Sequence, residues 1–295
     1  MQRIVLSASR RTDIPAFYMP WFMTRIKRGD FQVINPYNQK RTRIAARPDQ
    51  VHTIVFWSKN FGPFLNEGYA EELVRMGYRL FFNFTINAPH AVLEPGVPAL
   101  SERLDQLTRL VARFGATCIQ WRFDPICYFK NRAGVMENNL ARFPEIAEKV
   151  AALGIKVCIT SFVDIYAKVD KRSATAGITF VDPPTSQKIE RIEAMAGVLK
   201  KRDMVLMLCC EKELMAKLPA RLSVRSAACI PNDRLAALYG PDISLRRDGG
   251  QRTAAGCGCR TAKDVGDYPR HPCGHKCLFC YANPGPVPSD PRIDE

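Results

Sequence analysis

The chain has 295 residues, 46% of them hydrophobic, and a formal net charge of +14, which is enough to bury a core as one large domain or two small ones. No run approaches the roughly 18 to 20 uninterrupted apolar residues of a membrane span, and the apolar run near the N-terminus is too short for a signal peptide. We therefore expect a soluble, cytoplasmic protein that does not enter a membrane.

Short runs rich in Val, Ile, Phe and Thr recur along the chain, with helical patterns between them. Strands are predicted at 4–9, 52–58, 79–87, 118–124, 156–162, 204–210 and 222–229, and helices at 100–114 and 186–201. This alternation indicates βαβ units and a parallel sheet. We predict an α/β fold with a complete or partial (β/α) TIM-like barrel. An open doubly wound sheet is the rival, but no G-x-G-x-x-G follows any strand.

Reactive or hydrogen-bonding side chains follow several predicted strands. Parallel strands bring their C-terminal ends to one face, where barrel enzymes place their chemistry. The catalytic candidates are two arginine–aspartate sets, Arg10 with Asp13 and Arg122 with Asp124. Each set is suited to binding a cofactor carboxylate or an anionic substrate, or to forming a structural ion pair.

From about residue 244 the pattern changes to Gly, Pro, Arg and Cys without apolar periodicity. A segment of this kind needs something other than a core to hold it, and a metal site would serve. We predict a barrel domain over 1–243 and a Cys-rich, cluster-binding segment over 244–295.

Eleven cysteines without a secretory signal argue for metal or redox chemistry rather than a disulfide framework. Cys273, Cys277 and Cys280 have the spacing C-x3-C-x2-C. A 4Fe-4S cluster usually takes four thiolates, so three would leave one iron open. A structural zinc site completed by His271 or His275 is the alternative.

This spacing, with Phe279 before the last cysteine and Tyr281 after it, resembles the signature of the radical S-adenosylmethionine superfamily. The resemblance implies a full or partial (β/α) barrel with a 4Fe-4S cluster at its mouth. It also implies oxygen-sensitive reductive cleavage of S-adenosylmethionine, with an electron donor such as flavodoxin or ferredoxin. Typical members carry the triad after the first strand. Here it follows all the strands, so we expect the iron–sulfur tail to fold back over the barrel mouth.

Three segments carry a closer resemblance: "SASRRTDIPAFY", "FWSKN" and "CGCRTAKDVGDYPRHPCGHKCLFCYAN". They resemble the bacterial proteins grouped as domain-of-unknown-function family 1848. That resemblance spans about the whole chain and supports the architecture and a C-terminal cluster better than it supports a substrate. The residues expected to contact S-adenosylmethionine are Phe279, Tyr281, Ser58 and Lys59.

A second group of cysteines ends the sixth and seventh predicted strands and precedes the triad. If those strands are parallel neighbours, Cys209, Cys229, Cys257 and Cys259 converge and are enough for a second 4Fe-4S cluster. Zinc or small buried hydrophobes are the alternatives. The resemblance to family 1848 favours Cys209 over Cys210, because its motif there reads roughly Cys-x-Glu. The remaining cysteines are expected in the core: Cys118, Cys127 and Cys158.

Our leading hypothesis is a radical S-adenosylmethionine enzyme acting on an unidentified small-molecule or nucleic-acid substrate. The adenosyl radical is the default product of cleavage, and an aminocarboxypropyl radical is the alternative. The second hypothesis is a non-catalytic iron–sulfur or zinc protein that binds nucleic acid through its basic surface. Basic patches occur at 39–47 and 244–252, although neither has aromatic residues interleaved for base stacking.

Overall fold

The computed structural model describes residues 2–8, 10–34, 38–282 and 284–288. Its largest sheet contains β1 (Ile4–Ala8), β4 (Val51–Ser58), β5 (Leu80–Thr85), β6 (Ile119–Arg122), β9 (Val157–Thr160), β11 (Val205–Leu208), β12 (Arg225–Ser226) and β13 (Lys263–Val265). The order is β12-β11-β9-β6-β5-β4-β1-β13, and the pairings are parallel.

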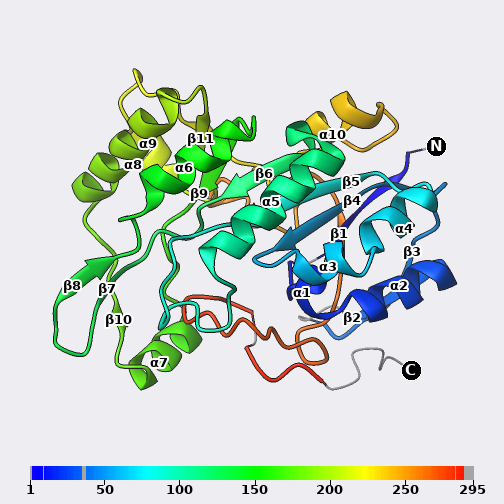
Figure 1. Cartoon of the computed structure of the whole chain (residues 1–295), viewed down its shortest axis with the longest axis horizontal. Helices are drawn as coiled ribbons and strands as arrows, with labels where there is room; N and C mark the ends of the chain where they lie inside the picture. Colours follow the sequence, from blue (N-terminus) through cyan, green and yellow to red (C-terminus); the bar gives the residue numbers. More distant parts are fainter. Residues whose placement is uncertain (1, 9, 35–37, 283, 289–295) are drawn as a thin grey trace.

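This sheet confirms the predicted α/β class and the parallel sheet, shown in Figure 1. Each predicted strand corresponds to one of its members, although the predicted 222–229 shortens to the two residues of β12, and residue 9 lies outside the described residues. Within the described ranges β12 and β13 are edge strands, and no closed barrel is found.

Two small antiparallel sheets are inserted between the parallel strands. β2 (Asp30–Ile34) pairs with β3 (Arg41–Ala45), and β7 (Tyr128–Lys130) lies between β8 (Met136–Asn138) and β10 (Thr179–Phe180). The sequence analysis predicts neither of these sheets. In the second sheet the strands have only two or three residues, which is too short to show an alternating pattern.

The helices lie mostly between successive strands of the large sheet. They are α1 (Ile14–Phe17), α2 (Met19–Arg28), α3 (Gly62–Asn66), α4 (Tyr69–Arg75), α5 (Leu100–Phe114), α6 (Phe143–Ala152), α7 (Ala167–Thr175), α8 (Thr185–Lys200), α9 (Lys212–Lys217) and α10 (Asn232–Tyr239), with a 3₁₀ turn at Ala116–Cys118. α5 and α8 confirm the two predicted helices.

The two faces of the sheet have different partners, because successive side chains of a strand point to opposite faces. On one face, Phe82 of β5 packs in the main core with Leu107 of α5. On the other, Phe81 packs with Val55 of β4 and with the buried cysteines that follow β11 and β12. The first face therefore stabilises the helical layer, and the second carries the polar and sulfur-containing residues described below.

The C-terminal segment contacts both edges of the large sheet. Gly258 N donates to Ala227 O, beyond β12, whereas β13 pairs with β1. A side chain at position 258 would place its Cβ 2.6 Å from Ala227 O, so only glycine permits this approach. Farther along, Leu278 N donates to Leu93 O. Figure 1 shows this orange and red segment passing between α7 and α1.

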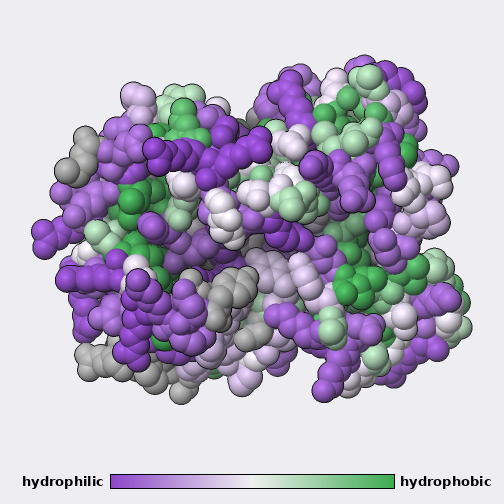
Figure 2. Space-filling view, turned by 180° about the vertical axis from the view of Figure 1, so that it is seen from behind, coloured by the Kyte–Doolittle hydropathy of each residue, from purple (hydrophilic) through white to green (hydrophobic). Residues whose placement is uncertain are grey.

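Within the described residues, no helix combines the length and the apolar character needed to cross a membrane. The face of the molecule seen in Figure 2 is largely hydrophilic, with its hydrophobic residues in separate patches.

Candidate functional site

Asp13 is a buried carboxylate on which donors from three parts of the chain converge. It precedes α1 and caps it, since its Oδ1 accepts a hydrogen bond from Ala16 N at 3.1 Å. The same oxygen accepts from Ser58 Oγ at 2.7 Å. Oδ2 accepts from Lys59 N at 2.8 Å and lies 2.9 Å from His275 Nε2. Asp13 therefore joins the ends of β1 and β4 to the C-terminal cysteine loop.

His275, between the first and second cysteines of the triad, has both ring nitrogens occupied. Nε2 faces Asp13, and Nδ1 lies 2.9 Å from Gly96 O. Gly96 N donates to His275 O, and a Cβ at position 96 would lie 2.6 Å from Gly274 O. A zinc ion bound through either ring nitrogen of His275 would replace one of these two buried hydrogen bonds. His271 packs against the rings of Tyr18 and Trp21.

The loop of Cys273, Cys277 and Cys280 is fastened by side chains from distant elements. Arg172 of α7 donates through Nη2 to Leu278 O at 2.7 Å and to Cys280 O at 2.5 Å. Tyr18 Oη donates to Pro272 O at 2.6 Å, and Tyr281 Oη to Arg10 O at 2.7 Å. The expected cofactor contact Tyr281 thus has its hydroxyl engaged in holding the loop.

The three thiols of the triad lie within electrostatic range of one another and of cations. Burial raises the pKa of Cys273 to about 12. Burial also raises the pKa of Cys277, while the Lys59 ammonium opposes that rise. Burial also raises the pKa of Cys280, and the nearby cations Lys59 and Arg172 partly offset that rise. Cations in this position would stabilise bound thiolates.

Lys59 and Glu94 form an ion pair beside the triad. Lys59 Nζ lies 2.5 Å from Glu94 Oε1 and 5.2 Å from the centre of the Phe279 ring. Burial lowers the pKa of Lys59, but Glu94 and Cys277 outweigh it and raise the pKa overall. The second oxygen of Glu94, Oε2, is buried without a hydrogen-bond partner among the described residues. It is an acceptor placed beside the predicted cofactor contacts.

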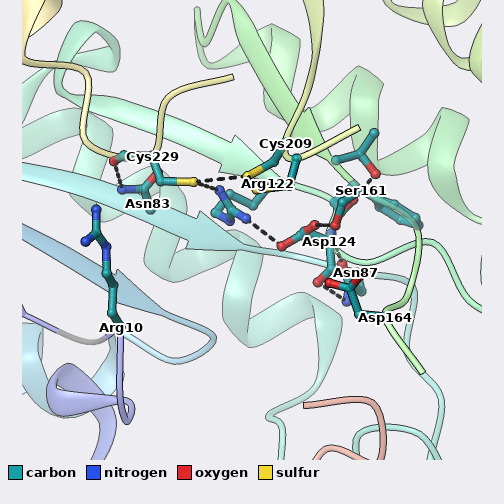
Figure 3. Close-up of polar contacts among 12 residues, drawn as sticks. Arg10, Asn83, Asn87, Arg122, Asp124, Ser161, Asp164, Cys209 and Cys229 are labelled. Atoms are coloured by element: carbon teal, nitrogen blue, oxygen red, sulfur yellow. Dashed lines mark hydrogen bonds and ion pairs between the residues drawn. The ribbon is translucent and has the colours of Figure 1, made fainter. Parts of the chain in front are cut away.

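Arg122 and Asp124 form the structural ion pair that was one of the three predicted roles. Arg122 Nη2 lies 2.5 Å from Asp124 Oδ2, and Nη1 donates to Cys229 Sγ at 2.7 Å, as Figure 3 shows. Ser161 Oγ donates to Asp124 Oδ1 at 2.6 Å. Burial acts to raise the pKa of Asp124, but Arg122 and the hydrogen bond from Ser161 outweigh burial and lower the pKa. The carboxylate therefore stays ionised.

Asn87 connects this pair to Lys59 and Glu94. Its Oδ1 accepts from Asp124 N at 2.8 Å, and its Nδ2 donates to Asp124 O at 3.1 Å and to Glu94 Oε1 at 3.2 Å. A continuous set of polar contacts therefore runs from the triad side of the site to Cys229 (Figure 3).

Arg10 pairs with two other aspartates rather than with Asp13, so the structural ion pair that was one of the three roles considered is not formed within this set. Arg10 Nη1 lies 3.3 Å from both Asp248 and Asp264, and the guanidinium carbon lies 5.6 Å from the centre of the Trp57 ring. The reason is local: Asp13 turns toward the start of α1, whereas Arg10 extends toward β13. Figure 3 shows the Arg10 side chain directed toward the side where Cys229 lies.

The four cysteines of the second group lie together with a fifth, Cys210. Cys209 Sγ lies 3.8 Å from the sulfurs of Cys210 and Cys229. Cys257 interacts with Cys210 and Cys259, and Cys259 with Cys229. The five-thiol group (Cys209, Cys210, Cys229, Cys257 and Cys259) is thus a closed ring of sulfur contacts. The neighbouring thiols of Cys229 and Cys257 lower the pKa of Cys259.

Among the described residues, no set of three or more His, Cys, Asp or Glu side chains has the arrangement that holds a single metal ion. The remaining cysteines are buried. Cys118 contacts Tyr239 Oη at 3.0 Å, away from both cysteine groups, and Cys158 lies in the main core. Cys127 packs with Cys277 and Phe279.

Two residues of the site, Glu94 and Arg172, carry no sequence signal. Glu94 belongs to the loop before α5, and Arg172 to α7, so neither follows a strand of the large sheet. Asn87 and Ser161 do follow strands of that sheet, and their position is the signal that identifies them.

Comparison with known proteins gives a match to one family description. The model of "Domain of unknown function (DUF1848)" matches residues 5–282, which include both cysteine groups. No curated protein matches the chain. The family match confirms the second resemblance drawn from the sequence, and its description assigns no activity.

Proposed function

The chain belongs to the family described as domain of unknown function DUF1848, and we propose that this member is a radical S-adenosylmethionine enzyme. Cys273, Cys277 and Cys280 would hold a 4Fe-4S cluster. The open sheet would serve as a partial (β/α) barrel with the substrate site at the C-terminal ends of its strands.

The observation that carries this proposal is the position of the cysteine loop. His275 binds Asp13 beyond the end of β1, and Cys277 lies within electrostatic range of Lys59 at the end of β4. The triad, last in the chain, therefore meets the first strands at their C-terminal ends. The superfamily places its cluster at the same ends.

The residues present fit a cluster with three protein ligands. The three thiols come from one short loop, and the nearby His275 is engaged by Asp13 and Gly96 rather than free to act as a fourth ligand. Lys59 and Arg172 would balance the negative charge of bound thiolates. When bound, the cluster would supply one electron, which breaks a carbon–sulfur bond of the sulfonium and releases methionine and an adenosyl radical.

The chain's own residues would bind and orient S-adenosylmethionine. Glu94 Oε2 is a buried acceptor without a partner among the described residues, and it would receive a hydrogen bond from the ammonium group of the cofactor. Phe279 would pack against the adenine. Lys59 contacts Glu94 Oε1 at 2.5 Å and would orient its carboxylate, and the low polarity of the site would strengthen these contacts. A one-electron donor such as flavodoxin or ferredoxin would complete the reaction.

The test is product formation by anaerobically purified protein reconstituted with iron and sulfide. With dithionite and S-adenosylmethionine we expect 5′-deoxyadenosine, or methylthioadenosine if the aminocarboxypropyl group is released. A colourless zinc protein would overturn the proposal, and so would a fully reconstituted protein that forms neither product. Either result would favour the non-catalytic, nucleic-acid-binding alternative.

A further inference from the structure

Three separate stretches of chain supply the five-thiol group. Cys209 follows β11, Cys229 follows β12, and Cys257 and Cys259 belong to the C-terminal segment. Backbone hydrogen bonds set their positions: Cys209 N donates to Thr160 O, and Gly258 N to Ala227 O. The glycine between Cys257 and Cys259 is the residue that allows the third stretch to approach so closely. The arrangement is therefore built by the fold.

Two buried arginines face these sulfurs, which distinguishes the group from an ordinary apolar core. Arg122 Nη1 donates to Cys229 Sγ at 2.7 Å. Arg10 interacts electrostatically with Cys229 and Cys259, and its Nη2 is buried without a partner among the described residues. Burying a guanidinium group costs free energy unless an anion compensates it. Asp124 compensates Arg122, and Asp248 and Asp264 compensate one nitrogen of Arg10. Metal-bound thiolates would supply the anion that Arg10 Nη2 lacks.

We infer that the five-thiol group is a second iron–sulfur site, in which Cys209, Cys229, Cys257 and Cys259 bind a 4Fe-4S cluster. These four thiols are buried, whereas Cys210 is partly exposed and adopts a left-handed backbone conformation, φ 59°. All four irons then have a cysteine ligand, so this cluster transfers electrons and has no open position for S-adenosylmethionine.

The choice between a cluster and one ion depends on the arrangement of the sulfurs. A single zinc needs four ligands converging on one point at about 2.3 Å, and the described residues contain no side-chain set with such an arrangement. The sulfurs instead follow one another around a ring. A four-iron cube needs no such common point, because each iron takes its own thiolate.

The experiment removes the triad and asks whether iron remains. In C273A/C277A/C280A protein, purified anaerobically and reconstituted, we expect about four iron and four sulfide per chain, and about twice that in the unmodified chain. The reduced variant should give the electron paramagnetic resonance signal of one 4Fe-4S cluster. Because ligand loss can impair folding, far-ultraviolet circular dichroism is compared with that of C118A, which changes a cysteine outside both groups.

The second variant, C229A/C259A, should lose this iron and keep the iron of the triad. A folded triad variant without iron would overturn the inference. One zinc per chain without sulfide would overturn it as well. These results are independent of the proposed function. If the unmodified chain binds only four iron and still cleaves S-adenosylmethionine, the proposed function stands and the second cluster is excluded. If the chain binds both clusters but does not cleave S-adenosylmethionine, the second cluster stands and the proposed function is excluded.

Discussion

His275 Nε2 lies 2.9 Å from Asp13 Oδ2, although 262 positions separate the two residues in the chain. Asp13 also holds Ser58 and the backbone of Lys59. One buried carboxylate thus fastens the C-terminal cysteine loop to the ends of the first two long parallel strands. The cluster proposed for the triad depends on this attachment.

Asp13→Ala should destabilise the protein and weaken iron binding by the triad. It removes an acceptor from four buried or partly buried donors, and hydrogen bonds to charged groups contribute about 1.5–3 kcal/mol each. We expect the free energy of unfolding to fall by at least about 3 kcal/mol in urea denaturation, and the iron content to fall with it. Asp105→Ala, which changes an exposed aspartate of α5, is the control. Equal stability of the two variants would contradict the role assigned to Asp13.

Cys277→Ala should abolish cleavage of S-adenosylmethionine, because it removes the buried central ligand of the triad. Product formation is measured by chromatography after incubation with dithionite. Cys118→Ala also truncates a buried cysteine, but one that contacts Tyr239 away from the site, and it should keep at least half of the activity. Cleavage at the normal rate by the Cys277 variant would remove the triad from the reaction.

The Lys59–Glu94 pair should behave as a coupled unit. Glu94→Ala leaves a mostly buried ammonium without its carboxylate, and breaking a buried pair in this way costs about 3–5 kcal/mol. Replacing both residues with apolar ones, as in K59M/E94L, should cost less than this single change. Urea denaturation of K59M, E94L and K59M/E94L measures the coupling energy. Additive effects would show that the contact at 2.5 Å contributes little to stability.

Arg172→Ala should make the triad iron labile. The side chain donates to two carbonyls of the cysteine loop, at Leu278 and Cys280, and losing two charge-assisted hydrogen bonds corresponds to at least about a tenfold change in an equilibrium. Iron release to a chelator is followed by absorbance. The neighbouring Lys171→Ala removes an exposed cation from the same helix and should leave the release rate unchanged. Matching rates in the two variants would count against loop anchoring by Arg172.

Mild acid should destabilise the fold through His52. Burial lowers the pKa of this imidazole, despite its hydrogen bond to Gly240 O and the nearby Asp242; Arg3 and Arg79 lower it further. The unfolded chain therefore binds a proton near pH 6.5 that the native protein does not, so stability falls as the pH drops below about 6.5. Urea denaturation between pH 7.5 and 5.5 should show a smaller decrease for His52→Gln. The same decrease in both proteins would exclude His52 as the cause.

The local pattern of hydrophobic residues was sufficient to predict the parallel sheet and its main helices. β4 and β5 are rich in Val, Ile and Phe because both of their faces are buried. α5 shows its apolar stripe because only one side packs on the sheet. The same pattern located Asp124 and Ser58 at strand ends. It could not pair Arg10 with Asp248 and Asp264, because those partners come from the return of a segment more than 230 positions away.

The residue types and their spacing determined by themselves that this chain forms alternating strands and helices and carries two sets of cysteines. These are local properties, set by side-chain periodicity and by the distance between neighbouring residues. Only the tertiary structure decided that Cys210 joins the second set, that Glu94 lies beside Lys59, and that the last segment meets the first strand. Such contacts depend on long-range backbone pairing and on glycines that permit close approach, and no short stretch of sequence encodes them.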